Sequence, residues 1–597
     1  MKLTTLKNYA LPVLFIFLII VYFFIGEGYT PSSDQASGII IGNDIANGNI
    51  FLNGWSLSTV TFYFTDLIWY ALLSLAGVSN HTQAILVPAI LLSALTCLSV
   101  YLVMLNKRVP WALFFSFGII GAYSSGIFNL AVSHIGAYVY TSIVYILLSQ
   151  DRKNTNNNNK IWITLLSTVI FFSDDISKYT LLIPIIMSLV IDFAKNKKTT
   201  TLSHIFIIIF SYILSKVLLH SIIFLGGFQL PGVGVPKFVT ISAFIDNIRY
   251  FLVGSLNIFQ ANIFGMDIGA LSASTGIRFL FMIFFYGYIT WALRKLLSYS
   301  FLDSSLLISS IIMPIAFIFS NIPSSVDSIR YIAPSIIFGS IFISRNVSAG
   351  IKSSYFLLIT ALASGGVIYF HSISLNKKNI EIEKISNFIE NNNLKRGFAS
   401  FWYASSISLN SKSIISPVVF NEHEGSVKPF LWLSKYQNYE NNNTFIIADN
   451  ESDRNSSVSA YGAPDNEYMI ESKIIMIWKD GISIPFDGFK IITNDKYFGS
   501  IGISDNNKVC PNSDSLFMVT GPYKPLKAGK YKVNISTKGE GGVSGDVVAI
   551  GGNVVFSKFN DVKEFIINVD KAYSDVEVRI YNRTGNACIK SLSVSPI

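Results

Sequence analysis

The stretch Glu27–Asp66, EGYTPSSDQASGIIIGNDIANGNIFLNGWSLSTVTFYFTD, decides how the rest of the chain is interpreted. It is polar, rich in Gly and Asn, and holds four acids, Glu27, Asp34, Asp44 and Asp66. An apolar run of membrane length precedes it, and a long series of such runs follows. Because charge is costly beside a membrane unless it is used or paired, this interval is a candidate site at a membrane surface. We expect Asp34 to be its catalytic carboxylate.

The composition is that of a membrane protein. Of 597 residues, 51% are hydrophobic and 14% are charged, whereas a typical soluble protein has roughly 25% charged residues. Long apolar runs recur to about Phe370 and then stop, which leaves a polar C-terminal part of about 225 residues, enough for one or two domains. The net charge of +9 does not indicate nucleic-acid binding, because most Lys and Arg of the first half lie in short loops, where they set the topology.

The apolar runs predict a polytopic α-helical protein with about eleven spans. They are Tyr9–Gly26, Thr82–Leu105, Val109–Phe128, Ile135–Ser149, Ile161–Ser173, Tyr179–Phe193, Leu202–Leu225, Ile277–Leu293, Leu302–Ser320, Ile332–Ser344 and Tyr355–Phe370. With the N-terminus in the cytoplasm, this order places the loop cations in the cytoplasm, as the positive-inside rule requires. These cations are Lys107, Arg108, Arg152, Lys153, Lys195, Lys197, Lys198, Arg294, Lys295, Arg345 and Lys352. The odd number of spans puts the C-terminal part outside.

The run Val60–Ala76 is also apolar, but we interpret it as a helix that lies in the outer interface. One span between Gly26 and Lys107 puts Lys107 in the cytoplasm, and two spans would not. Asp66 within the run agrees with an interfacial position. The membrane domain is therefore expected to cover residues 1–371, with long external loops at 27–81 and 226–276.

The external C-terminal part is predicted to contain two regions. Residues 372–498 begin with a helix over Lys377–Asn391 and continue as mixed α/β sequence. Residues 499–597 consist of short alternating runs between Gly and Asn turns, which is typical of a β-sandwich, and such a sandwich could bind glycan. Cys510 and Cys588 lie near its two ends and could form a disulfide outside the cytoplasm; the alternative is two unrelated buried thiols.

Three acids of the first half have alternative roles. Asp34 could orient or deprotonate a hydroxyl nucleophile, or it could cap the helix that follows it. Asp44 could be a turn or cap residue or a partner of another site residue. Asp66 could simply face water from the interfacial helix.

Two acids and a lysine at the mouth of a short span form a second candidate group. Asp174 and Asp175 could hold a divalent metal or position an acceptor, but Asp174 and Lys178 could equally be an ion pair one helical turn apart. His134, in the loop before the fourth span, is either a site residue or a satisfied polar loop residue.

Arg330 and Tyr331 stand at the outer start of a span, where they could hold a lipid phosphate by charge-assisted hydrogen bonds. Lys178 is a second candidate for that role. The alternative for Arg330 is an ion pair with Asp327. P-loop, GxGxxG, CxxC and HExxH patterns are absent from the sequence, which therefore gives no basis for a nucleotide, iron–sulfur or zincin site.

The order and sidedness of these features resemble the GT-C superfamily of membrane glycosyltransferases, which use polyprenyl-phosphate-linked sugars. The segments SSDQASGIIIGNDIANGN (32–49), Trp55 and FYFTDLIWYALLSLAG (62–77) are similar to the first external loop of that superfamily, which carries an acidic motif. IRYIAP (329–334) resembles a late Arg-Tyr-x-x-Pro element of many relatives. The resemblance covers roughly residues 1–345 and implies that Asp34 is the catalytic acid.

Two positions depart from the superfamily pattern. Gln35 stands where many relatives have Glu, so a two-acid motif is not present there. Many relatives have a second acid between the third and fourth spans, where this chain offers His134. Asp174 or Asp175 could take over that role.

The resemblance implies a hexosyl- or pentosyltransferase of a bacterial inner membrane, with its C-terminal domain in the periplasm. Its expected substrates are a polyprenyl-phosphate-linked sugar and a glycan acceptor such as O-antigen, the polysaccharide of lipopolysaccharide, or a related surface glycan. A divalent metal is compatible with Asp34, Asp174 and Asp175 but not required. The alternatives are a flippase or transporter of lipid-linked glycans and a polymerase of them.

Overall fold

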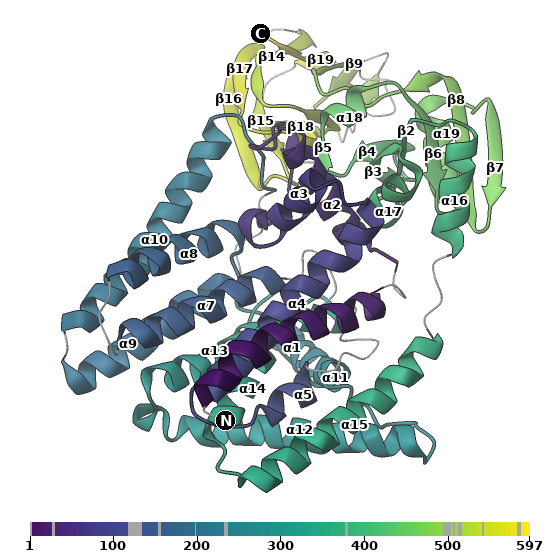
Figure 1. Cartoon of the computed structure of the whole chain (residues 1–597). Helices are drawn as coiled ribbons and strands as arrows, with labels where there is room; N and C mark the ends of the chain where they lie inside the picture. The colour runs from purple at the N-terminus through teal and green to yellow at the C-terminus, as the bar shows by residue number, and fades with distance from the viewer. Residues whose placement is uncertain are drawn as a thin grey trace. The chain divides into compact units, whose positions relative to one another are not determined.

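The structure is a computed structural model that describes residues 3–26, 30–117, 134–152, 157–197, 199–231, 237–375, 380–492, 503–505, 508–511, 516–539, 542–581 and 587–597 (Figure 1). The chain forms two compact units. The membrane unit comprises Met1–Ile50, Val60–Leu225 and Gly232–Lys378. The C-terminal unit comprises Phe51–Thr59, Gly226–Pro231 and Asn379–Ile597.

The described part of the membrane unit is helical. Its α-helices are α1 (Leu3–Gly26), α2 (Ser33–Ala46), α3 (Ile68–Leu75), α4 (Asn80–Met104), α5 (Trp111–Ser116), α7 (Ile135–Asp151), α8 (Asn157–Ser173), α9 (Ile183–Asn196), α10 (Thr199–Phe224), α11 (Ile241–Ile258), α12 (Ala270–Leu293), α13 (Phe301–Phe319), α14 (Ala333–Asn346) and α15 (Ile351–Leu375). Shorter π or 3-10 turns are η1 (Tyr63–Leu67), η2 (Lys178–Leu182), η3 (Leu296–Ser298) and η4 (Val326–Ile332).

Within the described ranges, 7 helices are long and apolar enough to cross a membrane. They are Asn80–Met104, Lys178–Asn196, Thr201–Phe224, Ala270–Leu293, Phe301–Phe319, Val326–Asn346 and Ile351–His371. Of the other predicted spans, those near residues 9–26, 135–149 and 161–173 coincide with α1, α7 and α8. The third predicted span begins as α5, and its residues 118–128 lie outside the described residues, as do Glu27, Lys153, Lys198 and residues 499–502. The number of about eleven spans therefore stays a prediction.

The apolar run Val60–Ala76 forms only η1 and α3. Together these cover Tyr63–Leu75, which at 1.5 Å per residue reaches about 20 Å, whereas the hydrocarbon core of a bilayer is roughly 30 Å thick. A straight helix of this length cannot cross, which agrees with the prediction that this run is not a span.

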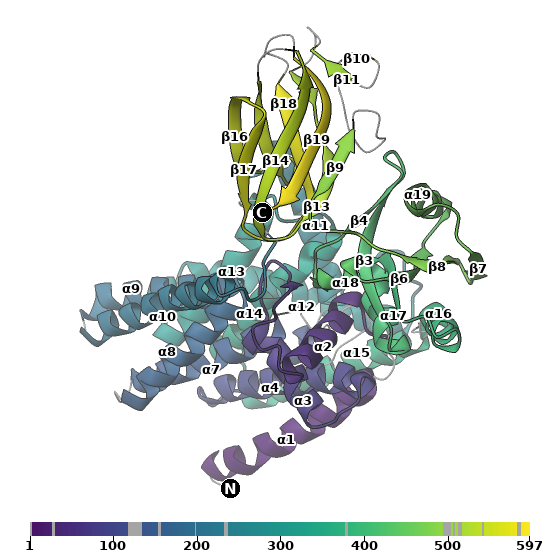
Figure 2. The ribbon, with the colours of Figure 1, turned by 90° about the horizontal axis from the view of Figure 1, so that it is seen from above.

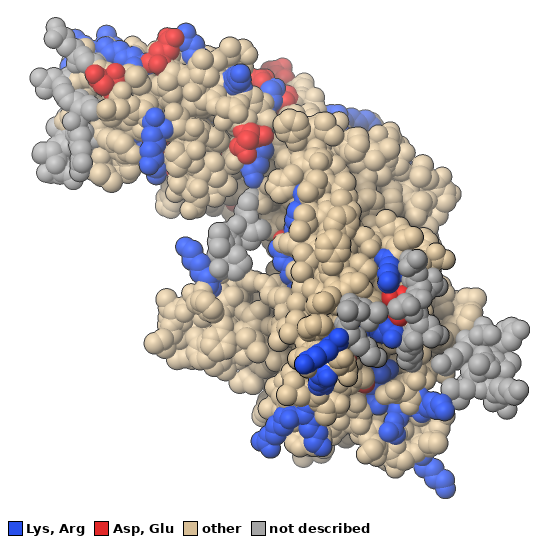
Figure 3. Space-filling model, turned by 90° about the vertical axis from the view of Figure 1, so that its left-hand side faces the viewer, with Lys and Arg blue, Asp and Glu red and all other residues tan. Residues whose placement is uncertain are grey.

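Large apolar side chains on several helices point away from the protein. Phe206 and Ile213 on α10, Leu280 on α12 and Phe356 on α15 are all more than half exposed. In water this surface would be unfavourable, but in a bilayer it contacts lipid at no cost. The lower part of the face in Figure 3 is mostly tan, and the charged side chains that it shows there are mainly Lys and Arg.

A buried arginine side chain lies inside the membrane unit. Arg278 on α12 has no exposed surface, and its Nε donates to the carbonyl of Phe259 at 2.8 Å while Nη2 donates to the carbonyl of Phe115 at 2.6 Å. Its guanidinium therefore supplies donors to two backbone carbonyls, which offsets part of the cost of burying the charge.

The first layer of the C-terminal unit is a six-stranded mixed sheet with helices against it (Figure 2). Its strand order is β4-β3-β2-β6-β8-β7, with β2 parallel to both β3 and β6. The elements are α16 (Ile380–Asn391), β2 (Arg396–Ser400), α17 (Phe401–Ser411), β3 (Ile414–Asn421), β4 (Ser426–Pro429), α18 (Gln437–Glu440), β6 (Asn443–Ala448), α19 (Glu451–Tyr461), β7 (Asn466–Ile470) and β8 (Lys473–Ile482).

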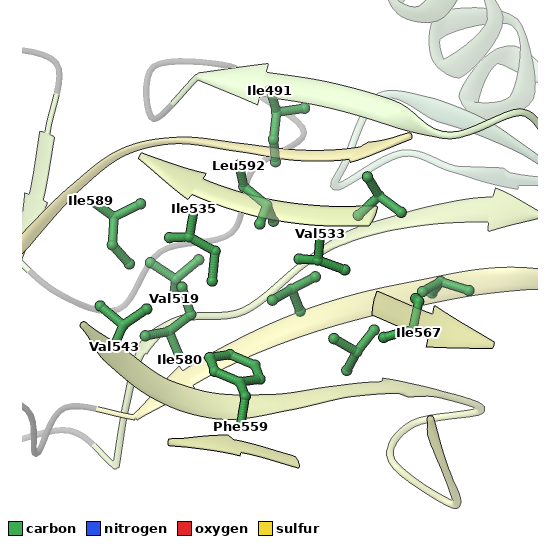
Figure 4. Packing of buried hydrophobic residues seen from close by; sticks show 14 of the residues in the cluster. Ile491, Val519, Val533, Ile535, Val543, Phe559, Ile567, Ile580, Ile589 and Leu592 are labelled. Atoms are coloured by element: carbon green, nitrogen blue, oxygen red, sulfur yellow. The ribbon is translucent and has the colours of Figure 1, made fainter. Parts of the chain in front are cut away.

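The second layer is a β-sandwich. One sheet joins β10-β11-β19-β14-β17 with β9 on β19, and the other joins β12-β18-β15-β16 with β13 on β18. The strands are β9 (Phe489–Ile492), β10 (Ile503–Asp505), β11 (Lys508–Cys510), β12 (Phe517–Val519), β13 (Pro522–Leu526), β14 (Gly529–Lys538), β15 (Val543–Ala549), β16 (Val554–Val562), β17 (Glu564–Val569), β18 (Tyr573–Tyr581) and β19 (Cys588–Pro596). Ile535 and Leu592 of one sheet meet Val543 and Ile580 of the other in a continuous apolar core (Figure 4).

A disulfide joins Cys510 on β11 to Cys588 on β19. The sandwich begins before the predicted boundary at residue 499, since β9 already pairs with β19.

Two short segments from the first half of the chain belong to the C-terminal unit. β1 (Trp55–Ser56) pairs with β5 (Ser434–Lys435). Gln229 donates its backbone N–H to the carbonyl of Trp55 at 2.8 Å, and its side-chain Oε1 accepts from the N–H of Ala572 at 2.8 Å. Lys571 Nζ donates to the carbonyl of Leu230 at 2.8 Å. The C-terminal unit is therefore completed by residues 51–59 and 226–231.

Candidate active site in the membrane unit

Asp34 lies in the first turn of α2, but it does not cap the helix. The Ser32 hydroxyl is the cap and accepts the N–H of Gln35 at 3.4 Å, so the alternative role considered for Asp34 is wrong. Asp34 is partly exposed, whereas most of α2 is buried. Burial raises the pKa of the Asp34 carboxyl above its usual value, and the positive charge of Arg330 acts in the opposite direction. The sequence separates these two residues by almost 300 positions, and the fold brings their charges within interaction range.

Arg330 presents an available guanidinium. It lies in η4, is exposed, and stacks over the ring of Tyr331 with its Cζ 5.4 Å from the ring centre. Among the described residues no carboxylate lies within 4 Å of it, so the ion pair with Asp327 is not formed. Arg330 is exposed, its guanidinium stacks on an aromatic ring, and its positive charge acts on Asp34. Such an arginine is suited to bind an anionic group of a substrate.

His134 and Asp174 form a close pair. Nδ1 of His134 is 2.5 Å from Oδ2 of Asp174, and the Asp174 side chain is fully buried. The other oxygen of Asp174 accepts the N–H of Ile176 at 3.0 Å. A buried carboxylate held in this way fixes the orientation of the imidazole and leaves Nε2 for another partner.

The position of the His134 ring connects this pair to Arg330. His134 has φ of 69°, a left-handed conformation that few residues other than glycine adopt and that often marks a functional residue. Its ring centre is 6.5 Å from that of Tyr331 and 5.2 Å from that of Phe62. His134 and Arg330 therefore share Tyr331 as a neighbour.

Asp66 is buried, with 1% of its surface exposed, so the expectation that it faces water is wrong. In the described part of the chain neither carboxylate oxygen has a hydrogen-bond partner of normal geometry. Burial raises the pKa of Asp66 to about 7; the nearby Thr65 hydroxyl, His134 and the Gly136 backbone lower it, and Asp174 raises it. The signal that could have found Asp66 is an acid inside an aromatic, apolar run, where a charge is costly unless it has a use.

Asp175 points away from this group and binds two lysines. Its Oδ2 is 3.0 Å from Lys178 Nζ and its Oδ1 is 3.0 Å from Lys216 Nζ. Burial alone would raise the pKa of Asp175, but Lys216 and Lys178 together lower it below the usual value. The predicted ion pair between Asp174 and Lys178 is therefore wrong, because Asp174 turns inward to His134 and Asp175 takes the lysine.

Asp44 lies at the other end of α2 from Asp34. Its Oδ2 accepts a hydrogen bond from Asn49 Nδ2 at 2.7 Å, which agrees with a turn role. Ten residues of helix separate the two acids by about 15 Å. Groups of three or more His, Cys, Asp or Glu side chains that could hold a metal ion are not found among the described residues.

No family model and no curated protein matches the chain. Among solved structures it is similar to the single-particle cryo-EM structure of arabinofuranosyltransferase AftD from mycobacteria, with a TM-score of 0.39 and 9% identity. The match covers 98% of this chain and 58% of that one, so the chain spans less than two thirds of the length of AftD. The proposals for this chain therefore rest on its own residues.

Proposed function

We propose that the chain is a membrane glycosyltransferase that moves a sugar from a polyprenyl-phosphate carrier to a hydroxyl of a glycan on the outer side of the membrane. The observation that carries the proposal is that the positive charge of Arg330, whose guanidinium is exposed beside Tyr331, acts on the Asp34 carboxyl. A base for an acceptor hydroxyl and a cation for a phosphate leaving group are the two groups that such a transfer needs.

The proposed step is a single displacement at the anomeric carbon of the donor sugar. The acceptor oxygen forms a bond to that carbon while the bond from the carbon to the phosphate oxygen breaks. Asp34 takes the proton of the acceptor hydroxyl, and the electron pair of the broken bond leaves with the polyprenyl phosphate, whose negative charge Arg330 stabilises. Because attack and departure occur on opposite faces, the configuration at the sugar carbon inverts.

The surroundings of Asp34 support its role as the base. Burial disfavours its charged form, so the raised pKa makes the carboxylate a better proton acceptor. The positive charge of Arg330 opposes that shift of the Asp34 pKa, and this interaction couples the base to the phosphate site.

We assign positioning roles to Asp174 and His134. Asp174 orients His134 through Nδ1, which leaves Nε2 of His134 as a donor or acceptor for the carrier phosphate or the acceptor sugar. Many GT-C relatives have a second acid between the third and fourth spans, where this chain has His134. In this proposal Asp174 takes the role of that acid. Asp175 and Lys178 serve instead as an ion-paired group, with Lys178 as an outer contact for the carrier phosphate.

The finer assignments belong to the same proposal. The acceptor class is a surface glycan such as O-antigen, the donor sugar is a hexose or pentose, and the membrane is the inner membrane of a bacterium with the N-terminus in the cytoplasm. The support for these assignments is the sequence resemblance of segments 32–49, 62–77 and 329–334 to GT-C enzymes.

The test compares two acids of the same helix. Membranes that lack the endogenous protein are supplied with each variant, with lipid-linked sugars extracted from the source organism, and with its surface glycan. Asp34→Asn should lower the transfer rate by about 10² to 10⁴, and Arg330→Gln by about 10² to 10³. Asp44→Asn is the matched control and should transfer at the parent rate, since Asp44 lies at the other end of α2, about 15 Å along the helix from Asp34. Full activity of Asp34→Asn would refute the proposal.

A further inference from the structure

The predicted external loop at 226–276 contains a long helix, α11, which is not one of the candidate spans. Its 18 residues, Ile241–Ile258, are about 27 Å long at 1.5 Å per residue. That length is close to the roughly 30 Å of the hydrocarbon core of a bilayer. Length alone therefore does not decide whether α11 crosses the membrane or lies along its surface, and the contacts of the helix do.

The middle of α11 contacts only the last turn of α13. Asn247 Nδ2 donates to the carbonyls of Phe317, at 3.2 Å, and Ser320, at 2.9 Å. The ring centres of Phe244 and Phe251 lie 5.2 and 6.4 Å from rings in that same turn. About 10 Å of α11 thus meets a single turn of α13. A helix that crossed the membrane beside α13 would contact several of its turns, so α11 lies across the end of α13 that we expect to face outside.

One face of α11 is apolar and exposed. Ile241, Ile245 and Leu252 each have more than half of their surface exposed, and their spacing of four and seven residues puts them on one face of the helix. We call these three residues the α11 stripe. Phe238, just before the helix, is 90% exposed as well. In water, apolar side chains exposed in this way would be unfavourable, so the stripe calls for an apolar partner.

The other two faces of α11 differ from the stripe and from each other. The protein face includes Gly254 and Ser255, which are buried. The polar face holds Ser242, Asp246 and Arg249, which are exposed and follow one another at spacings of four and three residues. A helix with an apolar face beside a charged one is typical of helices that lie in the plane of a membrane interface.

Both ends of α11 adjoin exposed apolar surface of candidate spans. Near its start, Phe244 contacts Phe319, an exposed residue at the end of the span α13. Near its end, the Ser255 hydroxyl is 2.9 Å from the hydroxyl of Tyr286 on the span α12, and one turn away on α12 lies the exposed Ile283. The spans α12 and α13 expose these side chains to lipid. The apolar surface of α11 therefore continues the lipid-facing surface of two spans, which favours lipid as its partner.

We propose that the α11 stripe docks into the outer leaflet of the bilayer, so that α11 lies in the membrane interface. The stripe contacts the upper part of the lipid acyl chains, while Asp246 and Arg249 on the polar face lie among the headgroups and water. A helix docked in this way sinks about 5 to 10 Å into the boundary between headgroups and acyl chains. The predicted external loop at 226–276 is then partly a membrane-bound element.

Docking of α11 also has a consequence for η4, which packs on its protein face. Gly254 lies so close to Ile329 of η4 that a Cβ at Gly254 would be 2.4 Å from Ile329 Cγ1. Because α11 supports η4 in this way, the depth of α11 in the leaflet sets the level of Arg330 relative to the lipid phosphates. The use of that level for a carrier phosphate rests on the proposed function, whereas the docking itself does not.

The test measures the depth of single fluorescent labels on the full chain in phosphatidylcholine vesicles. Cys97→Ala removes the free cysteine and leaves the disulfide intact. In this background a nitrobenzoxadiazole label is attached to Ile245→Cys or Leu252→Cys of the stripe. Asp246→Cys, on the polar face of the same helix, is the matched control, and Ile359→Cys, an exposed position within the span of α15, is the deep reference. The quenchers are lipids with a nitroxide near the headgroup or near the end of the acyl chain, and iodide in the water.

Labels at Ile245 and Leu252 should be quenched at least about twofold more by the shallow nitroxide than by the deep one, and the label at Ile359 should show the reverse order. Iodide should quench the label at Asp246 at least about threefold more than the label at Ile245.

Three results would overturn the proposal. Equal quenching by iodide at Ile245 and Asp246 would place the stripe in water, and stronger quenching of Ile245 by the deep nitroxide would make α11 a span. Quenching of Ile245 by none of the three would mean that protein, such as a second copy of the chain, covers the stripe. Each variant must have the far-ultraviolet circular dichroism of the parent. The measurement needs no transfer activity, so its failure is distinguishable from a failure of the proposed function.

Discussion

Asp66→Asn is expected to stabilise the membrane unit, and more so at high pH than at low pH. Asp66 is buried, and its pKa is raised from 3.8 to about 7. The folded state therefore holds the proton more tightly than the unfolded state does. The free energy of unfolding of the parent should be highest below pH 4, fall as the pH rises to about 7, and stay level above that.

The size of the effect follows from the two pKa values. The interval between 3.8 and about 7 corresponds to about 4 kcal/mol. This value is an upper bound, because polar groups around a buried charge relax toward it. Asn has the shape of Asp without the charge, so the advantage of Asp66→Asn over the parent should grow by roughly 3 kcal/mol between pH 5 and pH 8.

Unfolding in detergent, titrated with dodecyl sulfate and followed by tryptophan fluorescence, measures the difference at each pH. Asp44→Asn serves as the control, and its difference from the parent should change by less than about 1 kcal/mol over the same range. A stability difference for Asp66→Asn that is constant with pH, or that shrinks as the pH rises, would refute the burial of a titrating Asp66. Under the proposed function the variant should also lose transfer activity, because Asp66 interacts electrostatically with His134 and Asp174, which are positioning residues in that mechanism.

Three further predictions concern other parts of the chain. Arg330→Gln should move the acid limb of the pH–rate profile of transfer to higher pH, because Arg330 lowers the pKa of Asp34 and the rate falls as Asp34 takes up its proton; a limb that stays in place would contradict the coupling of the two charges. Arg278→Leu should lower the free energy of unfolding by about 2 kcal/mol, because two buried backbone carbonyls lose their donors; unfolding in dodecyl sulfate measures this, and an unchanged stability would be inconsistent with those bonds. Joint replacement of Cys510 and Cys588 by Ser should destabilise the sandwich by about 2 to 4 kcal/mol, because the bridge closes a loop over a sequence separation of 78; faster amide hydrogen exchange in β11 and β19 should report the loss, and unchanged exchange would argue against it.

The helices of the membrane unit could be predicted because length and composition decide them. A run of apolar residues must bury its backbone polar groups in hydrogen bonds once it is in lipid, and a helix does this locally. The run Val60–Ala76 was separated from the spans by the positive-inside rule at Lys107 and by Asp66 within it, and its helical part in the structure is only Tyr63–Leu75. The charge excess in the short loops added the expected orientation.

The direction of individual side chains could not be predicted in the same way. Asp174 and Asp175 are adjacent in sequence, and the phase of the turn before η2 decides that one points inward to His134 and the other outward to two lysines. The expectation that Asp66 faces water is wrong because it lies in an apolar helix, and such a helix has no polar face that marks its exposed side. The electrostatic interaction of Asp34 with Arg330 joins residues almost 300 positions apart in sequence, which local patterns do not contain.

The C-terminal unit carries a restriction on how this protein can be divided. Residues 51–59 and 226–231 belong to it, and the main chain passes between the two units at five peptide bonds. A single cut after Lys378 would leave four of those connections intact and release no domain. A fragment starting at Asn379 would lack the partner of β5 and the glutamine that accepts from Ala572. The unit is consequently a poor candidate for exchange by gene shuffling, because a donor gene would have to supply three separate pieces at once.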